Sequence, residues 1–167
     1  ATIAGSFTIL TSSQKTAGCV LANIGSQTTS ILVLEDSIPV SVQVFPLGSI
    51  DITNDIALGF RVPIEEAERI KLGIDSNVVT KKKLDEIIEA RLSDMFELIE
   101  NHLRKIGKNG LLPAGIILTG GGSNIPDIDQ LARQLLRLPA HVFSTHGDTS
   151  AQSLKDPGWA VAYGLCL

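Results

Sequence analysis

"ILTGGGSNIPDIDQLARQLL", residues 117–136, is the most informative segment of the sequence. It begins as an apolar run of strand length, passes through three consecutive glycines and continues as a helical pattern that a proline opens. The glycines let the backbone approach a ligand closely, and the helix offers unpaired N–H groups at its start. No G-x-x-G spacing and no Gly-Lys-Ser/Thr follows, so this is neither a dinucleotide fingerprint nor a Walker loop. A tight turn is the alternative, although three glycines exceed what one turn requires.

A second glycine turn, "NIGSQTTS", spans residues 23–30 between the apolar runs "GCVLA" and "ILVL". These runs predict two strands joined by a short connection. Gly25 permits a sharp turn, Thr28 and Thr29 offer hydroxyls, and successive N–H groups could form an anion nest. The segment is either a plain hairpin or a phosphate-binding loop, and taken alone it favours the hairpin.

The remaining segments predict an α/β chain. "IPVSVQVFPL" alternates with period two, which extends the first two strands into an antiparallel meander with Val40, Val42 and Val44 on one face. Thr80 can cap a long helix that has one buried and one solvated side. The other expected elements are helices at 49–60, 63–73, 81–106, 126–138 and 157–167, a short strand at 139–143, and loops at 11–18 and 144–155.

Composition limits the classes of function. An apolar fraction of 44% indicates a folded chain, and a net charge of -4 argues against a nucleic-acid-binding protein. Cys19 and Cys166 lie in apolar segments without metal-ligand spacing, so we expect buried free thiols in a reducing compartment and no metal site formed by cysteine. No segment has the length and apolarity of a membrane span.

A Glu-x-x-Lys pair lies in "EEAERIK". Glu68 and Lys71 are three residues apart, so on a helix they share one face and can pair with each other. They could equally reach a ribose or a base, and the pair alone favours the salt bridge.

The order of these three signals is more specific than any one of them. A strand–turn–strand phosphate loop, a helix with Glu-x-x-Lys and a strand ending in Thr-Gly-Gly-Gly resemble the second half of the actin, Hsp70 and sugar-kinase superfamily. The segments "GSIDITNDIALGFRVPIEEAERIKLG", "IIEARLSDMFELI", "LPAGIILTGGGSNIPDIDQLA" and "DPGWAVAYGL" narrow the resemblance to the FtsA family of actin-like bacterial cell-division proteins. The resemblance extends from about Cys19 to Leu167.

The resemblance implies a fold and its division. We expect an α/β, actin-like (ribonuclease H-like) mixed sheet flanked by helices, with an inserted, mainly helical subdomain. Residues 1–60 and 115–167 would form the sheet subdomain and 61–114 the helical insertion. The chain would then supply only the second of two lobes, so we expect weak or no nucleotide binding by this chain alone.

The same resemblance implies a site for ATP with magnesium between the two lobes of the full-length protein. The family's second phosphate loop usually reads Asp-Ile-Gly-Gly-Gly-Thr-Thr-Asp, and the glycine turn after the later strand holds the adenosine. Carried over by position, the nucleotide-binding residues are Asn23, Gly25, Ser26, Gln27, Thr28, Thr29, Glu68, Lys71, Gly120, Gly121, Gly122 and Ser123, with Asn124 beside them.

Departures from the family pattern concentrate in the phosphate loop. Asn23 and Ser30 replace the two aspartates, and Ser26 and Gln27 replace glycines. An amide can hold water or phosphate but gives a divalent ion no negative charge and cannot act as a base. We therefore expect no catalytic residue in this chain and weak or absent hydrolysis. An active ATPase or phosphotransferase of the same superfamily is the alternative.

The family also implies partners. FtsA proteins bind the C-terminal tail of the tubulin-like protein FtsZ, form filaments, and attach to the cytoplasmic face of the inner membrane through a C-terminal amphipathic helix. We expect this helix to be absent from the present chain. For the acidic and apolar tail we expect Arg91 as the first contact, with Arg104, Lys105 and Lys108 as further candidates. An actin-like pilus-assembly protein is a second alternative.

Overall fold

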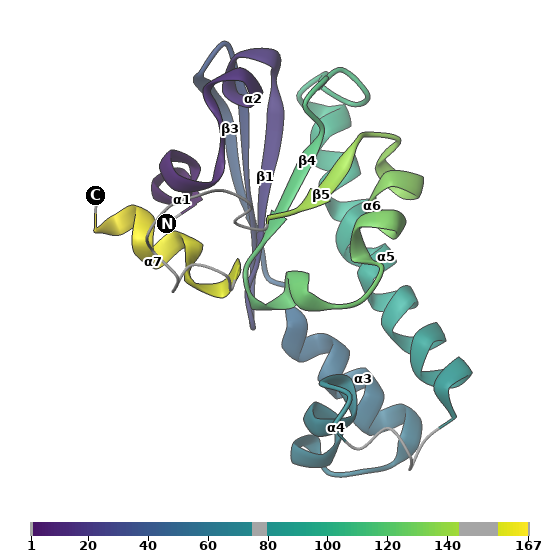
Figure 1. Cartoon of the computed structure of the whole chain (residues 1–167). Coiled ribbons are helices and arrows are strands. Elements are labelled where there is room, and N and C mark those ends of the chain that lie inside the picture. The colour runs from purple at the N-terminus through teal and green to yellow at the C-terminus, as the bar shows by residue number, and fades with distance from the viewer. Residues whose placement is uncertain (1, 75–79, 144–156, 167) are drawn as a thin grey trace.

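The computed structural model describes residues 2–74, 80–143 and 157–166, and forms a mixed five-stranded sheet with helices on both faces (Figure 1). The expected fold class is confirmed. The strands are β1 (Cys19–Ile24), β2 (Thr29–Glu35), β3 (Ile38–Phe45), β4 (Ile116–Thr119) and β5 (Ala140–Val142). The helices are α1 (Thr2–Ile9), α2 (Ser12–Ala17), α3 (Ser49–Phe60), α4 (Ile64–Lys71), α5 (Lys81–Lys105), α6 (Ile128–Leu136) and α7 (Ala160–Leu165), with 3₁₀ turns η1 (Gly121–Asn124) and η2 (Pro157–Trp159).

The sheet has the strand order β3-β2-β1-β4-β5. β1, β2 and β3 form the expected antiparallel meander, and a two-residue turn with positive φ at Asp36 and Ser37 connects β2 to β3. β4 pairs in parallel with β1, and β5 pairs in parallel with β4. Since β1 and β4 run in the same direction, their carboxyl ends lie side by side at the same end of the sheet.

Strand periodicity divides the core into two layers. On one face of the sheet, Val20 and Ala22 pack against a large apolar cluster that includes α3, α4, α5 and α6. On the other face, Cys19 and Leu21 pack in a smaller cluster with Ile9 of α1. The central strand β1 is therefore covered on both sides, which fixes the position of the loop that follows it.

Helices α3 and α4 lie beside each other beyond the end of the sheet that carries the carboxyl ends of β1 and β4 (Figure 1). The first turns of α5 extend into the same region, whereas its later residues Leu92 to Leu103 pack onto the sheet core. The division into a sheet subdomain and a helical insertion at residues 61–114 remains a prediction. The end of α4 is nevertheless linked to the start of α3, because Lys71 Nζ donates to the Ser49 carbonyl.

Several local predictions need correction. Residues 12–17 form a helix, not a loop, because Thr11 and Gln14 make a capping box. Thr80 precedes α5, but its side chain makes no capping hydrogen bond. Cys19 is buried as expected, whereas Cys166 is exposed, so the expectation of two buried thiols was wrong for the second. The predicted loop at 144–155 lies outside the described residues.

The valine stripe of β3 is on the exposed side of the strand. Val40, Val42 and Val44 share a face, as alternation predicted, but each is at least 44% exposed. The opposite face carries Ser41, whose hydroxyl lies 2.8 Å from His102 Nε2 of α5. β3 is an edge strand of the sheet, and its face with Ser41 lies against α5. Within the described residues, no helix is both long enough and apolar enough to cross a membrane.

Candidate functional site

The three-glycine turn follows β4 directly and packs against the end of β1. Gly120 has φ 88°, and a Cβ built there would lie 2.5 Å from Asn23 Oδ1 and closer still to the carbonyl oxygen of Ile24. A Cβ on Gly122 would collide with the side chain of Ile24. Two of the three glycines are therefore required by the contact between η1 and β1, whether or not a ligand binds.

Gly121 is different from its two neighbours. A Cβ built on it meets no heavy atom of the described residues within 4 Å, and its φ is not in the left-handed region. Neither packing nor backbone conformation therefore explains a glycine at this position. The open space above it is what the close approach of a ligand would require.

Hydrogen bonds within the protein hold the turn in place. The Ser123 hydroxyl donates to the Gly120 carbonyl at 2.7 Å, and Ser123 is 1% exposed. The Thr119 hydroxyl donates to the carbonyl of Pro157 at 3.0 Å, and the Gly120 N–H donates to the same oxygen at 3.2 Å. The hydroxyl of Ser123 therefore closes the glycine turn, and the Pro157 carbonyl of η2 holds the turn through two further hydrogen bonds.

The β1–β2 connection is a short loop whose polar side chains divide into exposed and buried ones. Gly25 N–H donates to the Thr28 carbonyl at 2.9 Å, which closes the turn. Ser26, Gln27 and Thr28 are exposed, whereas Thr29 is 1% exposed and its hydroxyl donates to the Leu47 carbonyl at 2.8 Å. Of the two predicted threonine hydroxyls, the loop presents only that of Thr28 to solvent.

Asn23 and Ser30, which replace the two aspartates of the family pattern, lie opposite each other on neighbouring strands. Asn23 at the end of β1 is the register partner of Ser30 at the start of β2. The Ser30 hydroxyl accepts a hydrogen bond of 2.9 Å from the Thr2 hydroxyl of α1, and the Asn23 amide lies against Gly120. The positions where the family pattern has two aspartates are therefore adjacent and uncharged.

The start of α3 supports this loop. The N–H groups of Ser49 and Ile50 donate to the carbonyls of Gly25 and Ser26 at 2.9 and 2.8 Å. These amides belong to the first turn of a helix, where an anion would otherwise find free donors. Because the loop itself uses them, α3 fixes the loop and is not an anion site at these two positions.

Glu68 and Lys71 pair as the helical spacing predicted, at 2.8 Å. Lys71 is nearly buried, with its side chain 9% exposed, and Glu68 is 42% exposed. Burial opposes ionisation of Glu68, but hydrogen bonds from Lys71 and Thr53, together with the charge of Lys71, lower the pKa of this carboxyl. Glu68 is therefore an ionised hydrogen-bond acceptor that remains accessible.

Ser49 links the loop to this pair. Its N–H donates to Gly25 and its carbonyl accepts from Lys71 Nζ at 3.2 Å. Ile24, one residue before Gly25, contacts the glycine turn. The β1–β2 loop, the glycine turn and the Glu68–Lys71 pair are thus linked to the carboxyl end of β1. Open α/β sheets bind ligands at the carboxyl ends of their parallel strands.

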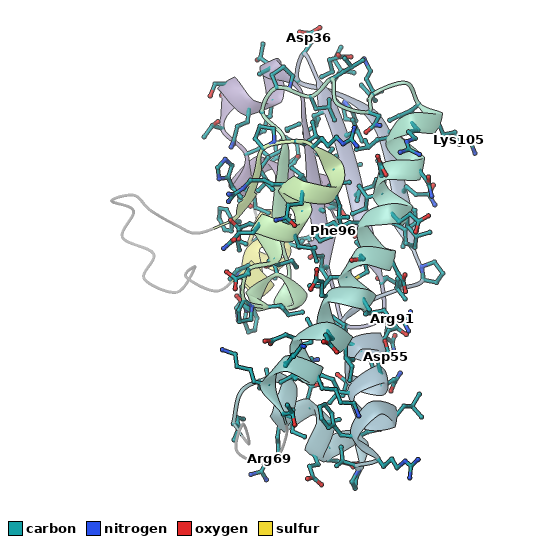
Figure 2. All side chains as sticks on the ribbon, turned by 90° about the vertical axis from the view of Figure 1, so that its right-hand side faces the viewer. Asp36, Asp55, Arg69, Arg91, Phe96 and Lys105 are labelled. Atoms are coloured by element: carbon teal, nitrogen blue, oxygen red, sulfur yellow. The ribbon has the colours of Figure 1, made fainter. Side chains whose placement is uncertain are left out.

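The cations predicted for partner binding do not form one cluster. Arg91 Nε and Nη2 donate to Asp55 at 2.6 and 2.9 Å, which raises the pKa of Arg91 and ties α5 to α3 (Figure 2). Arg104 pairs with Glu100 at 2.8 Å, and Lys108 pairs with Glu35 at 2.5 Å.

Lys105 is exposed near the far end of α5 (Figure 2). It lies 14 residues from Arg91, or about 21 Å along the helix at a rise of about 1.5 Å per residue.

Sequence reasoning missed the residues of α3 that organise the site. Thr53 is fully buried and bonds both Glu68 and Lys71, and Asp55 is the partner of Arg91. A signal was available for Thr53, because Ser49 and Thr53 are polar residues one turn apart next to the apolar positions Ile52 and Ile56. No comparable local signal identifies Asp55.

Two solved structures share the fold of this chain. MreB5 of Spiroplasma citri bound to ADP superposes with a TM-score of 0.78 at 16% identity, covering 99% of this chain and 56% of that one. The PilM–PilN type IV pilus biogenesis complex gives 0.78 at 22% identity, covering 97% and 49%. With this topology and these loops, the chain has the fold of a lobe of an actin-like protein.

Comparison with known sequences gives the family. The family described as "Cell division protein FtsA" matches residues 20–164, and this chain belongs to that family. The FtsA of Pseudomonas aeruginosa is 28% identical over 190 residues, covering 99% of this chain and 45% of the relative. The FtsA of Bacillus subtilis is 32% identical over 178 residues, covering 93% and 39%. The chain thus spans less than half the length of these relatives.

Proposed function

We propose that this chain is the nucleotide-binding and FtsZ-tail-binding lobe of an FtsA cell-division protein, with a sheet subdomain of residues 1–60 and 115–167 and a helical subdomain of 61–114. The observation that carries the nucleotide half is Gly121. It is a glycine for which the described residues give no packing reason, in the turn that packs against the end of β1. Within the whole protein, this lobe would act in filaments that link the division ring to the cytoplasmic face of the membrane.

In this proposal the adenosine end of the site is the better formed end. The glycine turn offers space above Gly121, and Glu68 offers an accessible carboxylate for ribose hydroxyls. The phosphate end offers the exposed side chains of Ser26, Gln27 and Thr28 but no carboxylate at position 23 or 30. Magnesium would then be held by the phosphates and by water that Asn23 can hydrogen-bond, and not by a protein charge.

Hydrolysis is expected to be weak or absent for the same reason. An amide at position 23 cannot accept a proton from an attacking water at neutral pH. The alternative is an ATPase in which the complete protein closes the site. It predicts magnesium-dependent turnover that Asn23→Ala reduces, whereas turnover unchanged by this substitution would show that Asn23 does not control the phosphate chemistry.

Gly121 gives a direct test of nucleotide binding. In the protein expressed from the complete gene, Gly121→Ala should lower ATP affinity about tenfold, and Gly121→Val should lower it further, because the added atoms occupy the ligand's space. The unfolding temperature should change by less than about 2 °C in Gly121→Ala. Gly122→Ala is the contrasting variant, since its methyl meets Ile24 and should lower stability. Unchanged ATP affinity in Gly121→Val would count against the proposal.

The second part of the proposal is that the helical subdomain binds the FtsZ tail. We propose that an acidic and apolar FtsZ tail contacts the accessible part of Arg91, whose side chain is 28% exposed while it pairs with Asp55. Titration with a tail peptide at low salt should show binding that Arg91→Ala weakens more than Arg104→Ala or Lys105→Ala. Asp55→Asn is the control, because it removes the ion pair with Asp55, keeps the guanidinium and leaves its longer contact with Asp94 at 3.4 Å. Absence of binding at high micromolar peptide would refute this half.

A pilus-assembly role is the competing assignment within the same fold. It draws on the likeness to the PilM–PilN complex, which at 22% identity supports the fold alone. Gene neighbours that encode pilus-assembly proteins and not FtsZ would favour it.

A further inference from the structure

Strand β3 forms one edge of the sheet, and its outer side is long, apolar and uncharged. Of the two edge strands, β5 has three residues and β3 has eight. Proteins protect such edges from pairing with short strands, charges, prolines or bulges. In β3, Pro39 and the register shift between Val33 and Leu34 affect only the first residues, and no residue from 38 to 45 carries a charge. The second half of the strand therefore has none of these protective features.

The backbone groups of a strand point alternately to its two neighbours, which gives their direction in β1 and β2. The Val20 N–H of β1 donates to the Gly115 carbonyl on the side of β4, so the backbone groups of the next residue, Leu21, point to β2. Leu21 is the register partner of Leu32. The backbone groups of Leu32 therefore point to β1, and those of the residue before it, Ile31, point to β3.

The same alternation continues into β3. Ile31 is the register partner of Gln43, so the backbone groups of Gln43 point to β2 and those of Val42 and Val44 point outward. The Val44 carbonyl agrees with this direction, since it accepts a solvent-exposed hydrogen bond of 3.1 Å from the Gln43 side chain. Among the described residues, neither valine forms a backbone–backbone hydrogen bond outside the strand ladder. Two N–H donors and two carbonyl acceptors thus face away from the sheet.

The same two valines carry exposed apolar side chains. Val42 is 49% exposed and Val44 is 53% exposed. Their register partners Leu32 and Ser30 lie on the face that α1 covers, where the Thr2 hydroxyl bonds Ser30. The valines belong to that face but have little cover of their own. A strand placed beside β3 would therefore cover apolar surface and bond the free backbone groups at the same time.

We propose that β3 pairs with the β3 strand of a second copy of this chain, antiparallel and about a twofold axis at Gln43. In this register Val42 of each copy lies opposite Val44 of the other, and all the outward backbone groups of both valines are bonded. Gln43 lies opposite its own copy, where an amide can both donate and accept. A register with Val42 opposite itself would instead pair Val44 with Val40, next to the register shift. Because the strand is uncharged, two copies of it do not repel each other.

This contact closes at two copies, because both contribute the same surface. It therefore differs from the head-to-tail contact of a filament, and it goes beyond the function proposed above. One pair of strands is smaller than a standard interface of about 1,600 Å², so we expect a weak dimer with a dissociation constant of about 100 µM.

Analytical ultracentrifugation of the protein from the complete gene, without nucleotide, tests the contact between about 5 and about 500 µM. The wild type should pass from monomer to dimer and go no further. Val42→Lys should weaken dimerisation about tenfold, whereas Leu58→Lys, the same change at a residue of α3 that is 78% exposed, should leave it unchanged. Adding Val44→Glu to Val42→Lys should restore the dimer, because the proposed register places the introduced charges opposite each other in both pairs.

Amide hydrogen exchange identifies what covers the edge. The Val42 and Val44 amides should exchange quickly in the dilute monomer and slowly at concentrations where the dimer forms. Slow exchange already in the dilute monomer would mean that another segment of the complete protein covers β3, and this would overturn the proposal. A wild type that stays monomeric at about 500 µM would overturn it as well, and would leave the edge to a strand of another protein. A dimer that Val42→Lys leaves intact would place the contact elsewhere and refute the assignment to β3.

Discussion

Gly48→Ala is predicted to disturb the junction between the β1–β2 loop and α3. The backbone of Gly48 has φ -146°, which any residue adopts, so the substitution adds no backbone strain. A Cβ at this position would lie 2.6 Å from the carbonyl carbon of Ser26, 2.7 Å from that of Gln27, and closer still to the Ser26 oxygen. Real Cβ atoms essentially never lie within 3.0 Å of such atoms, so the loop or the helix must move.

The magnitude follows from what the movement disrupts. Overpacking at a site without space typically costs about 1–3 kcal/mol. The obstructing atoms are backbone, and moving them stretches the bonds from Ser49 and Ile50 to the loop, each with a net value of about 1 kcal/mol. We therefore expect Gly48→Ala to lower the free energy of unfolding by about 2 kcal/mol. For a chain of this length, that corresponds to a decrease in Tm of about 4–8 °C.

Thermal and urea unfolding monitored by circular dichroism would measure this loss. Gly121→Ala is the matched control, because the same methyl group is added where no atom of the described part of the chain lies within 4 Å. Its unfolding free energy should change by less than about 0.5 kcal/mol. Equal unfolding curves for Gly48→Ala and the wild type would refute the reasoning. The contact between the loop and α3 would then be loose enough to accept a methyl group.

Three further predictions concern ionisable groups. Asp55→Asn should lower stability by about 1 kcal/mol in urea unfolding, since its bidentate pair with Arg91 is only partly exposed, and a loss that persists in an Arg91→Ala background would contradict this. Because the folded state lowers the pKa of Glu68, its ionisation stabilises the protein above the ordinary value of 4.5, and this stabilisation is lost as pH falls through the lower folded pKa. Glu68→Gln should therefore show a smaller loss of stability than the wild type between pH 6 and pH 3. Burial raises the pKa of Cys19 to about 11 despite the charge of Lys15, so a thiol reagent at pH 8 should label Cys166 quickly and Cys19 only on unfolding.

Much of the fold was predictable because its signals are local. Strand alternation and the glycines after β4 identified the meander and the later strand, and the order of the three segments identified the superfamily. The helix at residues 12–17 was also readable, since "TSSQ" at 11–14 is a capping-box sequence, and it was missed because the surrounding residues are polar. For β3, alternation predicted which residues share a face but not which face α5 covers, because that depends on segments far away in the sequence.

The site was predictable only in outline, because most of its contacts join residues far apart in the sequence. Glu68 and Lys71 are three residues apart, so helical geometry alone predicted their pairing. Two of the three acceptors of Lys71 lie on another helix, 18 and 22 residues away. Arg91 and Asp55 are separated by 36 residues, so no local pattern predicts their ion pair. Contacts of this range depend on how α3, α4 and α5 pack, which the sequence pattern does not specify.

The phosphate end and the nucleoside end of the proposed site differ in how many of their polar groups already form hydrogen bonds within the protein. At the phosphate end, Ser49 and Ile50 direct their N–H groups to the loop, and the paired positions Asn23 and Ser30 carry no charge. At the nucleoside end, Glu68 keeps an accessible oxygen, and Gly121 keeps open space. Under the proposed function, most of this lobe's contribution to affinity should therefore come from the nucleoside, and ADP and ATP should bind it with similar strength. Since Ser49 contacts both Gly25 and Lys71, a phosphate that moved the loop would act on α4 through α3.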